Sequence, residues 1–207
     1  MGTFERRMEI GVTVLLSVSA IGTSWAGYQA TLWSGNQIEF ASDAQSIRAR
    51  ATRATTKAGL QRTVDVSLFT SWLESYARHD TVYTQFIRHR FRPEFSLAFE
   101  AWLATKPAQN PNAPLTPFAM QQYHLLADDS ALLLDRLADS TATLGVAANQ
   151  NSDAYVLGAV LFATAMVFGG AARAESTSGR MQLILIALST MMCVMGLVRL
   201  ATSPTTL

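Results

Sequence analysis

The side chains that are able to bind a metal ion or move a proton are few and widely spaced in this sequence. The histidines are His79, His89 and His124, and the single cysteine, Cys193, lies within an apolar run. His124 and Asp128 form the best pair, because positions i and i+4 of a helix lie on the same side. No third ligand follows at a metal-site spacing, so a surface pair is the favoured interpretation and metal binding the alternative. We predict no resident metal and no cofactor.

Motifs of familiar catalytic centres are missing as well. The sequence contains no G-x-S-x-G nucleophile elbow and no Walker or dinucleotide-binding glycine pattern. Its net charge of +1 gives no reason to expect nucleic acid, whose binding requires clustered cations that neutralise phosphates. We therefore predict a protein that is not an enzyme and has no nucleic-acid partner.

The densest cationic cluster consists of Arg88, His89, Arg90 and Arg92, with Phe86, Phe91 and Phe95 interleaved. Such a mixture is able to contact anionic lipid headgroups or an acidic partner helix. The favoured interpretation is a solvated helix face whose charges pair with Glu94 and Glu100, because exposed ion pairs are routine in proteins. Both interpretations require these residues to lie on helices.

Composition indicates where those helices must lie. Of the 207 residues, 49% are hydrophobic and 15% are charged, against about 25% charged in soluble domains. The apolar residues are concentrated in three runs instead of being spread with core periodicity, as expected when lipid surrounds them. We predict an all-α integral membrane protein with transmembrane helices at 10–33, 153–172 and 181–199.

The first run carries no charge from Ile10 to Leu32, and at about 1.5 Å per residue it is long enough to cross the hydrocarbon layer. Trp25, Tyr28 and Trp33 crowd its far end, where amphipathic rings favour the membrane interface. The alternative is a signal peptide cleaved before residue 27, although the run is longer than a usual signal-peptide core.

Small side chains mark one side of two of these helices. Ser19, Thr23 and Gly27 recur every four residues in the first run, and Ala159 and Ala163 do so in the second. Small residues allow transmembrane helices to approach closely. We predict helix packing through them, with the lipid bilayer and either a second copy or another membrane protein as partners.

The last two runs are joined by the short polar segment 173–180, which predicts a membrane hairpin. Ser152 or Asp153 is the expected cap of its first helix. Basic residues in short connections favour the cytoplasm, so the arginines before residue 10 and those in 173–180 predict a cytoplasmic N-terminus and an extracytoplasmic middle region. The basic residues within 48–57 favour the opposite orientation.

The middle region, 34–152, contains few strand-forming clusters and is predicted to be helical. The first membrane helix is expected to continue outward, with Gly59 as its weak point. Asp80 is a helix cap, and Pro93 either begins a helix or bends one. The expected helix faces are Val64, Leu68, Trp72 and Tyr76, then Phe95, Phe99 and Trp102 as core positions, and finally Leu126, Leu133 and Leu137 with Leu134 and Leu144.

The proline- and asparagine-rich segment 106–117 is the clear loop, and a last helix is expected from Phe118 into the second membrane run. The predicted segments are therefore 1–9 as a polar start, 10–33, 34–152, 153–172, 173–180, 181–199, and 200–207 as a tail.

Several stretches of the chain, SWAGYQATLWSGNQ, RFRPEFSLAFEAWLATKPAQNPNAP, TPFAM and NQNSDAYVLGAVLFA, resemble a group of uncharacterised bacterial inner-membrane proteins. The resemblance covers most of the sequence. It implies a bacterial inner-membrane location and a three-helix topology, and it implies no activity and no catalytic residue.

Three functions are compatible with these patterns. The leading hypothesis is a non-enzymatic interaction or assembly protein with a helical ectodomain, which forms homo-oligomers. The second is a sensor-like ligand-binding protein that works with a separate signalling partner. The third is a small oligomeric channel or transporter, which the lack of ionisable residues deep in the apolar runs disfavours.

Overall fold

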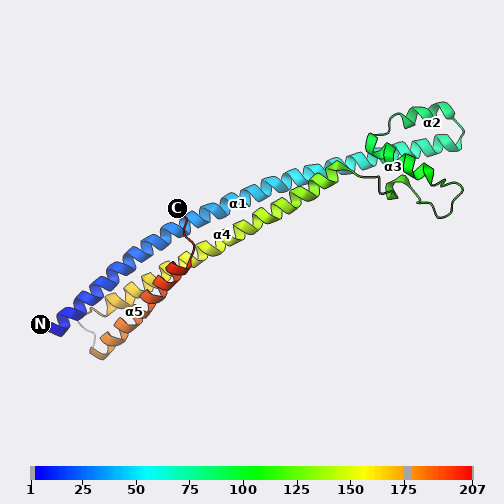
Figure 1. Cartoon of the computed structure of the whole chain (residues 1–207). Helices are drawn as coiled ribbons and strands as arrows, with labels where there is room; N and C mark the ends of the chain where they lie inside the picture. Colours follow the sequence, from blue (N-terminus) through cyan, green and yellow to red (C-terminus); the bar gives the residue numbers. More distant parts are fainter. Residues whose placement is uncertain (1–2, 175–178, 207) are drawn as a thin grey trace. The chain divides into compact units, whose positions relative to one another are not determined.

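A computed structural model describes residues 3–174 and 179–206, and every regular element in them is helical. Figure 1 shows the chain coloured along the sequence. The elements are the helices α1 (Thr3–Ala77), α2 (Thr81–Arg88), α3 (Pro93–Ala104), α4 (Leu126–Ala171) and α5 (Gly179–Thr202), with the 3-10 turn η1 (Pro117–Ala119).

Helices α1, α4 and α5 are each long and apolar enough to cross a membrane, with mean hydropathies of 1.5, 1.9 and 2.2 over their most apolar windows. The all-α class and the three candidate spans agree with the sequence prediction, and they indicate a multi-pass membrane protein. As predicted, α1 continues past its apolar run. Gly59 does not interrupt it, because a single glycine costs about 1 kcal/mol in a helix interior and the flanking residues favour helix.

The chain divides into two compact units, and long helices contribute to both. Unit 1 comprises residues 1–43 and 140–207, and unit 2 comprises residues 44–139. In unit 1, α1, α4 and α5 pack on one another. In unit 2, the second part of α1 packs with the first part of α4, with α2, α3 and η1 (Figure 1).

In unit 1, one buried aromatic ring packs between two glycines of neighbouring helices. Phe162 on α4 is fully buried, and a Cβ added to Gly22 on α1 or Gly196 on α5 would lie 2.7 or 2.9 Å from its ring. A Cβ on Gly169 would meet Leu16 on α1 at 2.9 Å. These glycines therefore leave the space that the Phe162 and Leu16 side chains occupy, and a larger residue at any of them would clash.

Heptad spacing with small residues characterises the helix pair of unit 2. On α1, Ala44, Ala51 and Ala58 are buried at intervals of seven, and on α4 they are matched by Ala131 and Ala138. A repeat of seven keeps one seam of each helix facing its antiparallel neighbour, and alanine allows the backbones to come close.

The predicted leucine seam of α4 is wrong, because alanines take that role. Leu126, Leu133 and Leu137 are 69%, 65% and 52% exposed, as Leu144 is at 53%, and only Leu134 is half-buried. The rule that the largest apolar residues face the core fails here because a close helix pair excludes them.

The caps and breaks of the shorter helices follow the sequence more closely. Asp80 caps α2 by accepting a hydrogen bond from the Tyr83 amide at 3.0 Å, as predicted. Pro93 begins α3 and does not bend a longer helix. Before α2 the chain turns at His79, whose φ of 58° is left-handed, and the Asp80 amide donates to the Ser75 carbonyl at 3.0 Å, which closes the end of α1.

Two helix ends differ from the prediction. α4 begins at Leu126 and not at Phe118, because Phe118 and Tyr123 turn into the aromatic core, with their ring centroids 5.1 Å apart. α4 also runs unbroken through residues 152–153, so neither residue caps a helix, and the Ser152 hydroxyl donates to the Ala30 carbonyl at 3.0 Å. Residues 175–178 of the expected loop 173–180 lie outside the described residues.

Candidate ligand-binding groove

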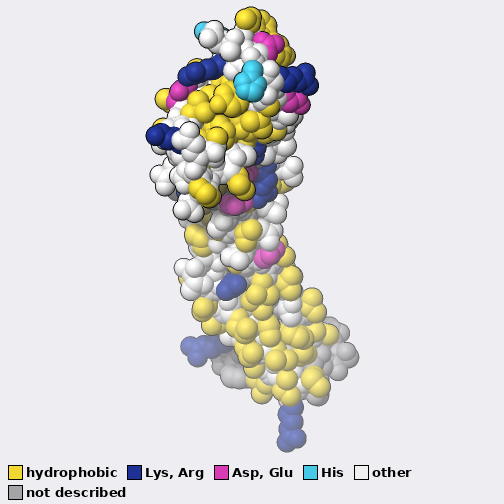
Figure 2. Space-filling view, turned by 90° about the vertical axis from the view of Figure 1, so that its right-hand side faces the viewer, with side chains coloured by type: hydrophobic (Ala, Val, Ile, Leu, Met, Phe, Trp, Pro, Cys, Tyr) yellow, Lys and Arg dark blue, Asp and Glu magenta, His cyan; other side chains and the backbone are white. Residues whose placement is uncertain are grey.

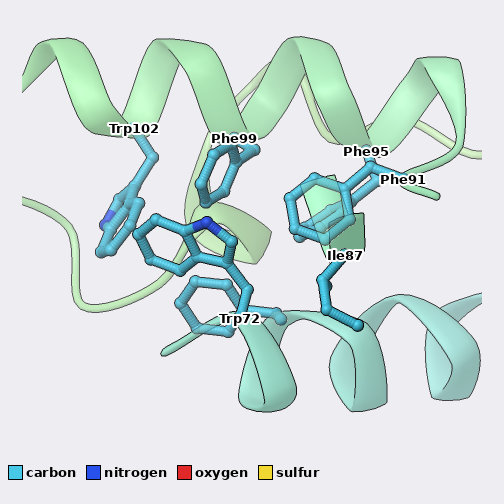
Figure 3. Packing of buried hydrophobic residues seen from close by; sticks show 7 residues of the cluster. Trp72, Ile87, Phe91, Phe95, Phe99 and Trp102 are labelled. Atoms are coloured by element: carbon cyan, nitrogen blue, oxygen red, sulfur yellow. The ribbon is translucent and has the colours of Figure 1, made fainter. Parts of the chain in front are cut away.

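Unit 2 has a core built almost entirely from aromatic rings. Its buried members are Phe69 and Trp72 on α1, Ile87 on α2, Phe91 in the following turn, and Phe95, Phe99 and Trp102 on α3. Figure 3 shows the rings of α3 pointing toward Trp72 and Ile87.

The rings meet mostly edge to face. Trp72 and Phe99 lie 4.7 Å apart between centroids at 79°, and Phe69 and Trp102 lie 5.4 Å apart at 85°. Aromatic pairs in this geometry stabilise by about 0.5–1.5 kcal/mol beyond their buried area. The prediction that Phe95, Phe99 and Trp102 form a core is confirmed, because all three are buried in this cluster.

The face expected on α1 is confirmed in part, because Trp72 is buried and Leu68 packs against the aromatic core. Val64 and Tyr76 are 50% and 58% exposed, whereas Asp65 and Phe69 are buried beside Trp72. The buried positions of α1 follow the interval of seven set by its pairing with α4, and this interval leads from Ala58 to Asp65 and Trp72.

A buried carboxylate joins three segments behind the aromatic core. Asp65 is fully buried, and it accepts hydrogen bonds from Arg92 Nε at 3.1 Å and Arg92 Nη2 at 2.7 Å. The Tyr123 hydroxyl donates to the same carboxylate at 3.0 Å. The three donors compensate the cost of removing the charge from water. The network also links α1 to Arg92, which precedes α3, and to Tyr123, which precedes α4.

The pKa values of Arg92 and of Tyr123 in this network are raised. The hydrogen bond with Asp65 raises the pKa of Arg92, so the guanidinium stays charged. Burial, followed by the hydrogen bond to Asp65, raises the pKa of Tyr123 to about 12. All three groups are committed to one another, which makes the network a structural tie and not an acid–base centre.

Beside the core lies an open groove of about 750 Å³. One wall is the last part of α1 with Trp72, Leu73 and Tyr76, and the other is Trp102 and Leu103 of α3. The loop from Lys106 to Thr116 forms the remaining side. Figure 2 shows hydrophobic side chains gathered in a patch on unit 2, with Lys and Arg side chains beside it.

The loop side of the groove is fixed by hydrogen bonds. Trp102 Nε1 donates to the Pro114 carbonyl at 2.7 Å, and the Asn112 amide donates to the Asn110 side chain at 3.0 Å. The groove is therefore largely preformed, and its volume is within the range of about 300–1,000 Å³ that ligand pockets occupy. Its lining residues include no His, Cys, Asp or Glu, and its titratable groups are Tyr76 and Lys106.

The predicted cationic cluster is mostly engaged within unit 2. Arg88 forms an ion pair with Glu100, and Arg92 lies 3.6 Å from Glu94 in addition to its bonds with Asp65. Arg90 lies over the Phe86 ring at 3.4 Å from its centroid. The interpretation of charges paired with Glu94 and Glu100 is thus the one that the structure shows, and contact with anionic lipid or a partner stays a prediction for Arg90.

The pair of His124 and Asp128 is not formed. His124 precedes α4, so the i and i+4 relation on a helix does not apply to it. Instead His124 Nε2 lies 3.2 Å from Asp129, and Asp128 accepts a hydrogen bond from Arg62 at 2.7 Å. Metal binding by His124 and Asp128 therefore has no geometric support in the described part of the chain.

The predicted packing residues of unit 1 differ in exposure. Ser19 is buried and Thr23 half-buried, whereas Gly27 is exposed, with no atom within 4 Å of an added Cβ. Ala26 and Ala30 occupy the intramolecular contact instead. Ala159 packs there too, and Ala163 is half-buried. Gly27 is left facing outward, where a contact with another protein stays a prediction.

The aromatic residues expected at the membrane interface also differ in their surroundings. Trp25 and Tyr28 are 41% and 56% exposed, as membrane-interface residues would be. Trp33 instead donates its Nε1 hydrogen to the Pro204 carbonyl at 3.0 Å. Fully buried Gln29 donates to the Thr206 carbonyl at 3.0 Å and accepts from the Thr206 amide at 3.0 Å, so both side chains attach the segment after α5 to α1.

Sequence reasoning missed Asp65, Gln29 and the slot around Phe162. A signal existed for Asp65, since it continues the interval of seven set by Ala51 and Ala58, and a lone acidic residue in such a series predicts a buried partner. No comparable signal marks Gln29 or Phe162, because their partners come from distant parts of the chain.

No family model matches this sequence, and no curated protein or solved structure was found to be similar to it. Functional inference therefore rests on the geometry of the chain itself, and the bacterial inner-membrane resemblance stays an expectation.

Proposed function

We propose that this chain is a non-enzymatic, membrane-anchored binding protein whose unit 2 receives an apolar ligand or partner segment in the aromatic groove. The carrying observation is the groove itself, with its walls of Trp72, Tyr76 and Trp102 and its hydrogen-bonded loop. Preformed apolar concavities with few polar groups are the usual form of ligand sites.

Unit 1 serves as the membrane anchor in this proposal. Its outward surface carries many exposed apolar side chains, among them Ile10, Ile21, Val160 and Val167, which lipid tails would cover. Among its described residues no charged side chain is buried, which supports an anchor over a channel or transporter. We place it in a bacterial inner membrane with a cytoplasmic N-terminus, following the arginine distribution.

Binding of neutral ring compounds to the full chain in nanodiscs tests the groove. We expect ligand-observed NMR to detect weak contacts for neutral one- and two-ring aromatic fragments, with empty nanodiscs subtracted. Leu73→Glu places a charge on the groove wall at a side chain that is 46% exposed, so it should abolish these contacts.

Leu60→Glu is the matched control, because Leu60 lies on the same helix at 65% exposure and outside the groove lining. Contacts that survive Leu73→Glu, or that disappear equally with Leu60→Glu, would contradict the proposed site.

A second candidate function is assembly through a second copy of the chain. Leu126 and Leu133 are exposed at an interval of seven on the part of α4 that belongs to unit 2, and two such residues suit a helix–helix contact. Native mass spectrometry in mild detergent should then show dimers or larger species that Leu133→Glu dissociates. A monomer under all detergent conditions would remove this candidate.

A further inference from the structure

The lining of the groove carries charge of one sign only. Lys106 is the one charged residue among the lining side chains, and it lies at the point where α3 ends and the loop begins. Its side chain is exposed and takes part in none of the ion pairs found in the described part of the chain. The groove lining therefore contributes one cationic residue and no carboxylate.

The backbone holds Lys106 in a defined place. Its φ of 51° is left-handed, a conformation that glycine adopts at lower cost. Its amide donates to the Leu103 carbonyl at 2.9 Å, and its own carbonyl accepts from the Gln109 and Asn110 amides at 2.9 and 3.0 Å. A lysine therefore lies at a turn where glycine would be less strained. Residues in strained conformations are common at binding sites, so the Lys106 side chain is a candidate for ligand contact.

The walls offer ring faces more than hydrogen bonds. The rings of Trp72 and Tyr76 lie nearly parallel, with centroids 5.1 Å apart and planes at 16°, and Tyr76 is 58% exposed. The indole N–H of Trp102 is already bound to the Pro114 carbonyl. A ligand therefore gains from stacking and apolar contact along the walls, and its charged interaction must come from Lys106.

We infer that the groove binds an aromatic carboxylate, with its ring against Tyr76 and Leu73 and its carboxylate toward the Lys106 ammonium. This inference rests on the proposed function and adds the charge of the ligand. A compound of one or two rings fits a groove of about 750 Å³. A cationic ring compound would find the same walls but would face a like charge, which lowers its affinity.

Three naphthalene derivatives whose substituents are negative, neutral and positive test this inference. They are 2-naphthoate, 2-naphthamide and 2-naphthylmethylammonium, titrated against the full chain in zwitterionic nanodiscs and followed by ligand-observed NMR. We expect 2-naphthoate to bind about three- to tenfold more tightly than 2-naphthamide, the range of a partly exposed ion pair, and the ammonium compound to bind most weakly. Added salt should reduce the advantage of the carboxylate.

Lys106→Gln should remove the preference for 2-naphthoate and leave 2-naphthamide binding unchanged. Lys57→Gln is the matched control, because Lys57 is the other lysine of the chain and lies outside the groove lining. Glutamine keeps a polar side chain of similar reach at residue 106, so both variants should unfold at the temperature of the wild type.

The outcomes separate this inference from the function on which it rests. If all three compounds bind equally and Leu73→Glu abolishes their binding, the groove is a ligand site but the carboxylate preference is wrong. If 2-naphthoate keeps its advantage in Lys106→Gln, the inference is also overturned. If none of the compounds contacts the protein, this inference falls with the proposed site.

Discussion

The two units of this chain both bring long helices together at small residues, but they differ in the side chains that fill the remaining interior. Unit 1 brings α1, α4 and α5 together at glycines, with Phe162 between Gly22 and Gly196. Unit 2 fills its interior with rings such as Phe95 and Phe99, and buries one ion pair beside them. In lipid, helix association depends on close packing because apolar burial brings little gain, whereas in water the burial of large rings is itself the driving force.

The comparison predicts that removing a buried charge from unit 2 has the largest effect. Asp65→Ala leaves the Arg92 guanidinium without its carboxylate and Tyr123 without its acceptor, so we expect a loss of about 3–5 kcal/mol in the unfolding free energy of unit 2. Denaturation of the full chain in detergent, followed by tryptophan fluorescence, measures it. Glu100→Ala removes a half-exposed pair and should cost about 0–1 kcal/mol.

Truncation of one buried ring in each unit tests the comparison directly. Phe99 and Phe162 are both fully buried. Phe99→Ala should destabilise unit 2 by about 3–5 kcal/mol, because it loses apolar burial and leaves a cavity. Phe162→Ala should cost unit 1 less, since its unfolded helices remain in lipid and only packing is lost. Equal losses in unfolding experiments with mixed micelles would show that the two units do not differ as described.

Enlarging a glycine should affect unit 1 in proportion to the space around it. In Gly22→Ala the new methyl group would lie 2.7 Å from the Phe162 ring, so we expect destabilisation of about 1–3 kcal/mol from overpacking. Gly27→Ala, on the same helix, meets no atom within 4 Å and should leave the monomer unchanged. A change in oligomer size with Gly27→Ala alone would indicate that this exposed glycine contacts another chain.

The last predicted effect is a dependence of the stability of unit 2 on alkaline pH. The pKa of Tyr123 is about 12 in the folded chain against an ordinary 10.0, so the unfolded chain loses this proton first. Stability from this group is complete below pH 10 and decreases as the pH rises toward about 12. Tyr123→Phe should flatten this part of the unfolding profile. Tyr83→Phe, at an exposed tyrosine, serves as the control.

The sequence was most informative where one segment decides its own structure. The cap at Asp80 and the aromatic face of α3 each depend on neighbouring residues, and the structure confirms them. Of the two alternatives at Pro93, the structure shows the helix start. The beginning of α4 could not be predicted in this way, because Phe118 and Tyr123 leave the helical pattern to join rings from α3.

For the candidate site, the sequence supplied the core rings but not the groove. Phe95, Phe99 and Trp102 were expected to be buried, and an interior role for aromatic residues follows from their size. The groove also requires Trp72 and Tyr76 of α1 to lie opposite the loop at Lys106. These residues are far apart in the sequence, and they come together only because α3 folds back on α1.

The sequence by itself determined the helical class, the three apolar spans and the cap at Asp80, because composition, run length and neighbouring residues are sufficient for these features. Only the tertiary structure decided that alanines and not leucines line the seam of α4, that Asp65 takes Arg92 as its partner, and that Lys106 stands alone at an aromatic groove. These features depend on which faces of distant segments meet, and the spacing of residues within one segment does not contain that information.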